Sequence, residues 1–417
     1  MFKYLKLSLC IIVVMIFSFI FPYIVYCDDI DYIVDDTNIY EKISETSSNV
    51  NAIPDINSRA AVVIDRSSNT ILYGKNEKEK RKMASTTKIM TALVVIENAN
   101  LDDVVTISKK AAGTGGSRLG LKTNDQITVN NLLYGLMLCS GNDAAVALAE
   151  HVGGSVEEFA VLMNSKANDL GLLNTHFVTP HGLDKDEHYT TAYELALLSN
   201  YALKNETFAK IVNTKYTSIT INDYSKSLHN TNELLGVLNG VYGIKTGFTN
   251  GANRCLVTAC KRENLDIICV VLGADTKSFR TKDSIKLIEY VFANYSNVNI
   301  SNILNVDFDN WKKDNYNKIN IVKATFKNID LKLDTLKYNN IAILNTDIKN
   351  ISTDVYVNNN LVAPVFKNDV VGCINIKNGN DIIYSCNILS DSDINKRNIS
   401  DYFSMFLHNY YSIILKN

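Results

Sequence analysis

A serine followed three residues later by a lysine is the first pattern in this sequence that could carry covalent chemistry. Ser85 and Lys88 stand at the start of an apolar segment that we expect to be helical from about Thr86 to Glu97. Residues three apart share one face of a helix, so the lysine amine can reach the serine hydroxyl. A serine hydroxyl is a poor nucleophile until a base takes its proton. A lysine can be that base where burial and a second cation favour its neutral form.

A second motif lies in a polar turn between two apolar segments that we expect to be helices. In a functional interpretation, Ser140 belongs to a proton relay and Asn142 holds a substrate amide. In a structural interpretation, Asn142 or Asp143 only caps the second helix. The motif alone does not decide between these two interpretations, since Ser-x-Asn triplets also occur elsewhere in the chain.

The third motif is Lys245, Thr246 and Gly247, at the end of a predicted strand that begins at Val241. Lys245 is the second cation that could act on Lys88. Lysine and threonine side chains suit recognition of a terminal carboxylate, and glycine leaves room for a substrate backbone beside the strand. Each motif is short enough to arise by chance, so their order and structural settings carry the prediction.

In this order the motifs resemble the active-site set that penicillin-binding proteins share with serine β-lactamases. Their flanks are most similar to the low-molecular-mass, serine-type D-alanyl-D-alanine carboxypeptidases. Four segments carry this resemblance: residues 136–144, 170–177, 180–184 and 243–249. The similarity covers about residues 55–295. A further segment, residues 363–372, resembles the β-rich C-terminal domain of the same family.

The resemblance implies a role for each motif residue. Ser85 would be the acylated nucleophile, Lys88 its base and Ser140 part of the proton transfer. Substrate binding would fall to five residues: Asn142, Lys245, Thr246, Gly247 and Phe248. The backbone N–H groups of Ser85 and Phe248 would form the oxyanion hole.

Two positions near these motifs, Phe248 and His181, bear on which side chains take part in the chemistry. Family members often carry His where this chain has Phe248, a difference that affects side-chain help at this point but not the backbone donor. His181 matches a family motif, but its Pro/Gly setting is typical of a structural turn, so we expect no catalytic role for it.

The implied reaction removes the terminal D-Ala from a peptidoglycan stem pentapeptide ending in D-Ala-D-Ala, and β-lactam antibiotics would be inhibitors. An endopeptidase acting on cross-links would use the same residues, and this alternative stays open. A class A-type β-lactamase needs a Glu-x-x-Leu-Asn element, and the nearest match, at Glu194, has Leu where Asn belongs. We interpret Glu194 as part of a helix capping box. A catalytically inactive wall-binding protein would not need intact Ser85, Lys88 and Lys245.

Composition limits the remaining possibilities. The 417 residues are 46% hydrophobic and 21% charged with a net charge of −2, which indicates a globular chain of about two domains. Without a block of basic residues, nucleic acid is not an expected partner. The six His show no metal-binding spacing, so we predict no metal and no cofactor. The cysteines are interpreted as free buried thiols, although Cys373 and Cys386 could oxidise as a pair.

Residues 1–27 combine two early lysines with a long apolar run, which predicts an export signal. Cleavage after Cys27 and retention as an uncleaved anchor both stay open. Either outcome places the rest of the chain outside the cytoplasm, at the outer face of the cytoplasmic membrane. Residues 28–53 are polar and acidic, and we interpret them as a linker.

The remaining pattern predicts an α+β fold. Apolar strands at 61–65, 70–73, 241–246, 255–260 and 265–272 enclose a helical block at 129–203 and precede a helix at 282–294. The resemblance makes this a β-lactamase/transpeptidase-like catalytic domain, an antiparallel sheet with a helical subdomain, over 54–298. A small all-β domain is expected at 299–389.

The last segment, 390–417, is predicted to be a spacer and an amphipathic tail. Large apolar residues recur at three- and four-residue steps from Ile399 to Ile414. We expect this helix to lie on a membrane surface. The alternative is a terminal helix packed on the β domain.

Overall fold

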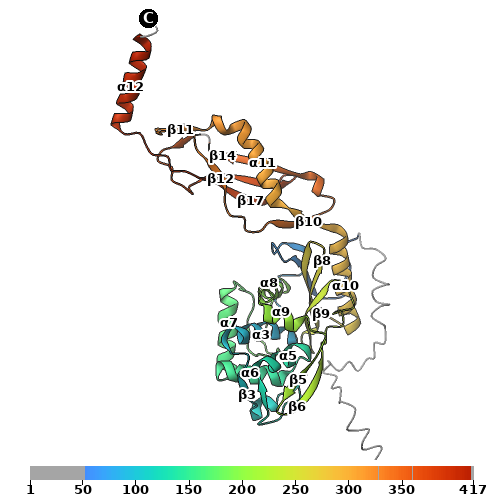
Figure 1. The fold of residues 1–417 in the computed structure, drawn as a ribbon. Helices are drawn as coiled ribbons and strands as arrows, with labels where there is room; N and C mark the ends of the chain where they lie inside the picture. The colour runs from blue at the N-terminus through green and yellow to red at the C-terminus, as the bar shows by residue number, and fades with distance from the viewer. Residues whose placement is uncertain (1–51, 327, 359, 415–417) are drawn as a thin grey trace, which may run out of the picture. The chain divides into compact units, whose positions relative to one another are not determined.

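The computed structural model describes residues 52–326, 328–358 and 360–414, which form two compact units divided between Asn294 and Tyr295 (Figure 1). The predicted export signal and nearly all of the predicted linker lie outside the described residues. Each unit has its own hydrophobic core.

The first unit is built on a five-stranded antiparallel sheet in the order β2-β1-β9-β8-β7. The strands are β1 (Ala60–Asp65), β2 (Ile71–Lys75), β7 (Val241–Thr249), β8 (Asn253–Arg262) and β9 (Leu265–Ala274). The strands β1, β8 and β9 are buried over most of their length because both faces of the sheet are covered. This confirms the antiparallel sheet that the sequence predicts.

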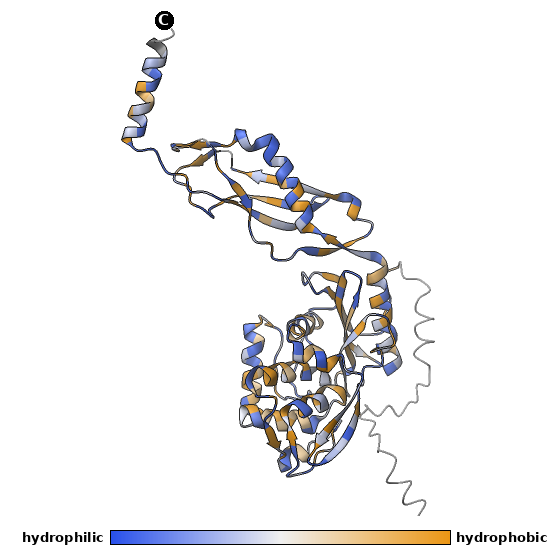
Figure 2. Ribbon diagram, viewed as in Figure 1, coloured by the Kyte–Doolittle hydropathy of each residue, from blue (hydrophilic) through white to orange (hydrophobic). Residues whose placement is uncertain are grey.

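Helices cover the two faces of this sheet (Figure 1). One face packs on α10 (Lys277–Asn294), which begins five residues before the predicted Lys282. The other face packs on a helical layer with these bounds: η2 (Ala84–Thr87), α3 (Lys88–Asn98), α4 (Lys109–Ala112), α5 (Val129–Leu138), α6 (Asn142–Gly153), α7 (Val156–Asp169), α8 (Ala192–Ala202) and α9 (Glu206–Val212). Figure 2 shows hydrophilic and hydrophobic residues alternating around α7 and α10, as expected for helices with one buried face.

Two small hairpins complete the first unit. They are β3 (Val104–Thr106) with β4 (Gln126–Thr128), and β5 (Tyr216–Ile221) with β6 (Tyr224–His229). Neither hairpin was predicted. The hairpin β5–β6 leads directly into Thr231, which contacts β7.

Capping-box patterns, including the one predicted at Glu194, start two helices of the first unit, but only through one of their two bonds. The Ser155 and Thr191 hydroxyls accept from the N–H groups of Glu158 and Glu194 and start α7 and α8. The carboxylate of Glu194 does not close its box. It accepts instead from the backbone of Asn174 at 2.9 Å and from the Thr175 hydroxyl at 2.6 Å. Glu194 therefore anchors the segment after α7, which is a structural role.

The second unit contains a four-stranded antiparallel sheet in the order β12-β17-β16-β14. Its strands are β12 (Leu331–Leu333), β14 (Ile351–Val357), β16 (Val370–Asn378) and β17 (Asp381–Ser390). Two short pairs flank it: β10 (Tyr295–Asn299) with β13 (Asn340–Leu344), and β11 (Asn320–Val322) with β15 (Asn360–Val362). The β-rich character of this region agrees with the sequence prediction.

The second unit also contains a helix that the sequence analysis did not predict. Helix α11 (Ile300–Asn315) buries Ile300, Leu304 and Phe308 in the core of this unit. These three residues lie four apart and therefore share one helical face. The surrounding Asn and Asp residues favour turns, so the helical pattern is hard to recognise in the sequence.

The cysteines of the described residues are thiols that form no disulfide with one another. Cys373 lies opposite Asn387 in the sheet, whereas Cys386 lies opposite Ile374. Successive side chains of a strand point to opposite faces, so Cys373 and Cys386 face away from each other. The oxidised pair that the sequence left open is not formed.

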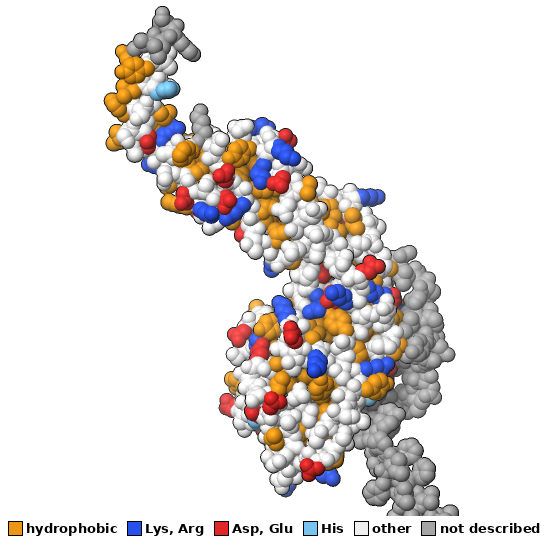
Figure 3. Space-filling model, viewed as in Figure 1, with side chains coloured by type: hydrophobic (Ala, Val, Ile, Leu, Met, Phe, Trp, Pro, Cys, Tyr) orange, Lys and Arg blue, Asp and Glu red, His pale blue; other side chains and the backbone are white. Residues whose placement is uncertain are grey.

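The last described helix is α12 (Ile399–Ile414). Figure 3 shows apolar side chains along one side of it, and Ile399, Phe403 and Phe406 are 87%, 62% and 64% exposed. Within the described ranges, no helix is both long enough and apolar enough to cross a membrane.

Candidate active site

The structure brings the three sequence motifs together between the helical layer and the edge strand β7. The amine of Lys88 lies 2.9 Å from the Ser85 hydroxyl and 2.7 Å from Oδ1 of Asn142. From the strand side, a Cβ atom at Gly247 would lie only 3.0 Å from the Ser85 backbone nitrogen. The pair of Ser85 and Lys88 therefore has the other two motifs as direct neighbours.

Lys88 is fully buried, at the start of α3. Its amine donates hydrogen bonds to the Ser85 hydroxyl, to the Asn142 side chain and to the backbone carbonyl of His181 at 2.9 Å. A separation of 2.9 Å is within the range for direct proton transfer between the serine oxygen and the lysine nitrogen. The predicted nucleophile and the predicted base are therefore in contact.

Ser85 lies in the 3-10 turn η2 rather than at the N-cap of an α-helix, and its side chain makes no capping bond. The turn is held by Thr87, whose hydroxyl donates to the Ala84 carbonyl at 2.8 Å. Ala84 itself has φ = +48°, a left-handed conformation that is unusual for a non-glycine residue. The predicted nucleophile thus lies in a tight and locally strained turn.

The segment around His181 supports this turn. A Cβ at Gly182 would lie 1.9 Å from the Ala84 carbonyl oxygen, so only glycine fits there. His188 contacts the Thr87 hydroxyl at 2.7 Å. Burial, followed by the positive charge of Lys88, lowers the pKa of His181 to about 3. Its imidazole is therefore neutral, and the residue contacts Lys88 through its backbone carbonyl.

Ser140 follows α5 in a left-handed conformation, with φ = +59°. Its side chain is buried, and its hydroxyl has no hydrogen-bond partner among the described residues. Buried hydroxyls are nearly always hydrogen-bonded in proteins. The Ser140 hydroxyl is therefore available for a partner that enters the site.

The strand motif contributes a buried cation and a hydroxyl. Lys245 is 1% exposed, and its amine donates to the Thr246 carbonyl at 3.0 Å. The Thr246 hydroxyl lies 2.7 Å from the hydroxyl of Thr231. The guanidinium carbon of Arg254 lies over the Phe248 ring, 3.6 Å from the centroid of that ring. The Phe248 side chain is therefore occupied by this contact.

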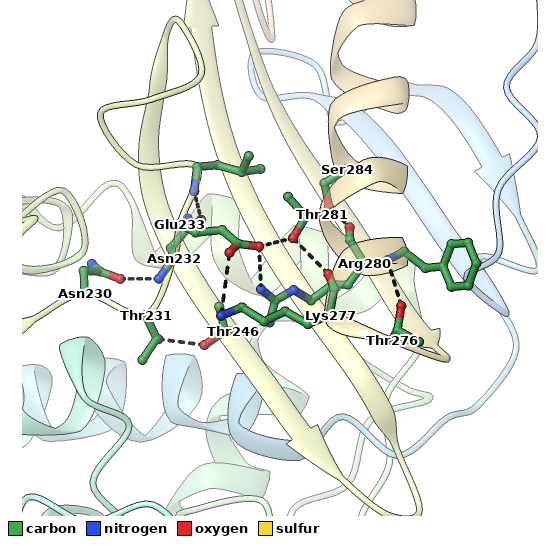
Figure 4. A network of polar contacts seen from close by, with 12 residues as sticks. Asn230, Thr231, Asn232, Glu233, Thr246, Thr276, Lys277, Arg280, Thr281 and Ser284 are labelled. Atoms are coloured by element: carbon green, nitrogen blue, oxygen red, sulfur yellow. Dashed lines mark hydrogen bonds and ion pairs between the residues drawn. The ribbon is translucent and has the colours of Figure 1, made fainter. Parts of the chain in front are cut away.

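A network of charged residues at the start of α10 was missed by the sequence analysis (Figure 4). Glu233 contacts Arg280 at 3.2 Å, Lys277 at 3.7 Å and the Thr281 hydroxyl. Arg280 is 2% exposed, and its Nε atom has no hydrogen-bond partner among the described residues. Figure 4 shows this network in the same region as Thr231 and Thr246.

With Lys245, these residues make the region around Thr246 rich in positive charge, which suits an anionic ligand. No motif points to Arg280, since α10 shows only ordinary helical periodicity in the sequence. Its role becomes visible only from burial and from the contact with Glu233.

Two family models match this chain. The D-alanyl-D-alanine carboxypeptidase family matches residues 46–276. The C-terminal domain of penicillin-binding protein 5 matches residues 312–396. The first match covers more than half of the chain, and the second falls within the β-rich unit.

Curated relatives carry the same description. The chain is 40% identical over 243 residues to D-alanyl-D-alanine carboxypeptidase DacF of Bacillus subtilis, covering 57% of this chain and 62% of that protein. It is 39% identical over 257 residues to DacC of Escherichia coli, covering 59% and 64%. The matched region thus spans slightly less than two thirds of these two relatives.

Solved structures agree with the fold. Penicillin-binding protein 5 from Haemophilus influenzae superposes with a TM-score of 0.70 at 29% identity, covering 83% of this chain and 99% of that one. The carboxypeptidase DacD from Francisella tularensis gives 0.67 at 28% identity, covering 83% and 96%. The similarity therefore extends over both units.

Proposed function

The chain belongs to the D-alanyl-D-alanine carboxypeptidase family, and from this premise we propose that it removes the terminal D-Ala from peptidoglycan stem peptides through an acyl-enzyme on Ser85. The observation that carries the proposal is the buried Lys88 amine, hydrogen-bonded to the Ser85 hydroxyl. The curated relatives bear this activity in their names.

The first chemical step is acylation. Ser85 Oγ attacks the carbonyl carbon of the penultimate D-Ala while Lys88 takes the hydroxyl proton. The peptide C–N bond then breaks, and the terminal D-Ala leaves as an amine after receiving a proton through Ser140. Water hydrolyses the ester, which restores the Ser85 hydroxyl and releases the shortened stem peptide.

Charge on the tetrahedral oxygen is stabilised by the backbone N–H groups of Ser85 and Phe248. Support comes from the close approach of Gly247 to the Ser85 nitrogen, which places the two donor segments side by side. Gly247 is the residue before Phe248, and a larger side chain there would push the strand away from the nucleophile.

Substrate binding is assigned to the groups around these donors. Asn142 binds the substrate amide, and Lys245 and Thr246 bind the terminal carboxylate. The buried guanidinium of Arg280 is a further group in the positive region beside Thr246 (Figure 4). A carboxylate in this region gains charge-assisted hydrogen bonds, which are the strong ones.

We also propose that the enzyme works at the outer face of the cytoplasmic membrane and binds β-lactam antibiotics as inhibitors. Residues 1–27 would be the export signal, and α12 would lie on the membrane surface. Support for the second assignment comes from the exposure of Ile399, Phe403 and Phe406 on that helix.

A labelled penicillin tests the proposed nucleophile. The protein should gain one drug molecule, and peptide mapping should find it on Ser85. Ser85→Ala should abolish the label and keep the fold, since the lost hydrogen bond to Lys88 is worth about 1 kcal/mol. The measurements are intact-protein mass and the melting temperature. Labelling that survives in a folded Ser85→Ala protein would refute the assignment.

A further inference from the structure

Asp143 directly follows Asn142 and is fully buried, yet no step of the proposed reaction uses it. Its carboxylate accepts hydrogen bonds at 2.7 to 3.0 Å from the backbone N–H groups of four residues: Leu119, Gly120, Leu121 and Ala144. Three of these donors belong to residues 115–121, a loop outside every helix and strand. Several amide donors on one carboxylate make a strong anchor, so Asp143 fixes this loop against the start of α6.

The same loop holds the side chain of Asn142. The backbone nitrogen of Asn142 donates to the Ser117 carbonyl at 2.8 Å, and its Nδ2 donates to the Gly115 carbonyl at 2.7 Å. A carbonyl can only accept, so the NH₂ end of the amide must face Gly115. The oxygen end is then left facing Lys88, at 2.7 Å. The loop therefore decides which end of the amide meets the lysine.

Two glycines allow the 115–121 loop to lie close to Asn142 and Asp143. Gly116 has φ = +83°, and a Cβ there would lie 2.5 Å from Nδ2 of Asn142. At Gly141 a Cβ would lie 2.9 Å from Asp143 Oδ1 and 3.0 Å from the nitrogen of Leu119. With so little space, a displacement of the loop must displace the Asn142 side chain too.

From this chain of contacts we infer that Asp143 is a positioning residue for the reaction: it holds the 115–121 loop, and the loop keeps Asn142 Oδ1 on Lys88. The inference rests on the proposed function, because its effect is read through acylation of Ser85. The other role available to Asp143 is purely structural, as an acidic residue in the first turn of α6 that stabilises the helix N-terminus.

Asp143→Asn separates these roles when it is compared with a matched control. An asparagine presents an NH₂ end to amide donors that need an acceptor, so the loop loses its anchor. Asp283 is also a buried carboxylate, 1% exposed, and it accepts from Asn57 and Ser58 away from the motifs. Asp283→Asn therefore disturbs the fold in a similar way without touching the 115–121 loop.

The measurement is the second-order rate of acylation by a fluorescent penicillin, taken at a temperature where both variants are folded. Asp143→Asn should slow acylation by about tenfold or more, since small misplacements of catalytic groups have effects of this size. Asp283→Asn should lower the melting temperature and leave the rate unchanged. Equal acylation rates in the two folded variants would overturn the inference.

The pH dependence of acylation gives a second readout that a structural role would not move. Asn142 Oδ1 accepts a hydrogen bond from the Lys88 amine and therefore favours its protonated form. Loss of this acceptor should shift the low-pH limb of the Asp143→Asn profile to lower pH. A limb that stays at the wild-type pH would mean that Asn142 has not moved, and would count against the inference.

Two glycine substitutions test the contact between the 115–121 loop and Asn142 while Asp143 stays intact. They provide the test if Asp143→Asn does not fold. Gly116→Ala introduces both backbone strain and a clash with Asn142. Gly171→Ala introduces similar strain, at φ = +71°, with nothing within 4 Å of the new atom. Only Gly116→Ala should slow acylation, and equal rates in both would refute the inference. Failure of the proposed function looks different, because the wild-type protein itself would then not be labelled.

Discussion

At the scale of single residues, the site depends on how Lys88 is surrounded. A fully buried amine normally carries a large desolvation cost in its charged form. Here it is surrounded by three acceptors, from Ser85, Asn142 and His181. In the proposed reaction it can therefore hold a proton between the steps, and it lies in contact with the Ser85 oxygen from which that proton would come.

Substitution of Lys88 can distinguish whether this residue acts as a general base or only through its positive charge. Lys88→Arg keeps the positive charge, but a guanidinium stays protonated and cannot accept the serine proton. Acylation by penicillin should fall by about 10²–10⁴-fold, the usual contribution of a general base, and Lys88→Ala should show nearly the same defect. Stopped-flow or gel-based acylation rates measure this. Near-normal rates for Lys88→Arg would mean that Lys88 acts only through its charge.

The contact between Ser85 and Lys88 could be predicted from spacing, although not for the correct local reason. The sequence predicts a shared α-helical face, whereas Ser85 lies in a 3-10 turn. Side chains at i and i+3 are aligned in a 3-10 turn, so the contact is retained. Arg280 and Asp143 could not be assigned from sequence, because their significance lies in burial and in backbone donors from distant segments.

At the scale of elements, the support under the nucleophile is the segment 179–188. His188 is 2% exposed, and its Nδ1 accepts from the Val178 nitrogen at 3.0 Å while Nε2 faces the Thr87 hydroxyl. Burial, with a smaller effect of His176, lowers the pKa of His188 to about 4. The folded protein therefore keeps this imidazole neutral in a range where an unfolded chain protonates it.

This difference makes the stability of the first unit depend on pH. With a folded pKa of about 4 and an ordinary value of 6.5, the stabilisation is present above pH 6.5 and is lost as the pH falls towards 4. Each such proton contributes a slope of about 1.4 kcal/mol per pH unit. His181, whose pKa is lowered to about 3, adds a second contribution with the same sign.

His188→Gln should remove one of these two contributions. Urea unfolding between pH 7.5 and 5 should show a smaller loss of unfolding free energy in His188→Gln than in the wild-type protein. His408→Gln, at an exposed position in α12, is the control and should keep the wild-type slope. If His188→Gln also kept that slope, protonation of His188 would not be linked to unfolding.

Elements with strong apolar patterns were predictable and those without were not. Strands β1, β8 and β9 are built around largely apolar runs, and their positions follow from the sequence. Hairpin β5–β6 buries Ile219, Ile221 and Leu228 but exposes Tyr216 and Tyr224, so it lacks the unbroken apolar run that marks the central strands of the large sheet. Packing and backbone pairing, rather than residue pattern, determine such elements.

At the scale of the whole molecule, the two units differ in their secondary structure, and each has its own hydrophobic core. The first contains every motif residue of the proposed site. The second, from Tyr295, is β-rich and is followed by α12. This separation predicts that changes to the end of the chain leave the chemistry at Ser85 intact.

Helix α12 provides the corresponding test. Residues 399–412 of this helix are exposed or partly exposed, with Tyr410 and Tyr411 at 53% and 59%, which argues against the alternative of a helix packed on the β domain. Burial of a large apolar side chain is worth about 1.5–3 kcal/mol, so even partial burial of this face in a lipid interface would hold the protein there.

A form lacking residues 1–27 should bind liposomes, and a form lacking both 1–27 and 399–417 should remain in solution. Both forms should have the same melting temperature and hydrolyse a short D-Ala-D-Ala peptide equally well, because the exposed face of α12 contributes nothing to either core. Liposome co-sedimentation, thermal unfolding and D-Ala release measure the three properties. If the doubly shortened protein unfolded or aggregated, α12 would be part of the folded β-rich unit. If both forms stayed in solution with liposomes present, its apolar face would serve a contact other than lipid.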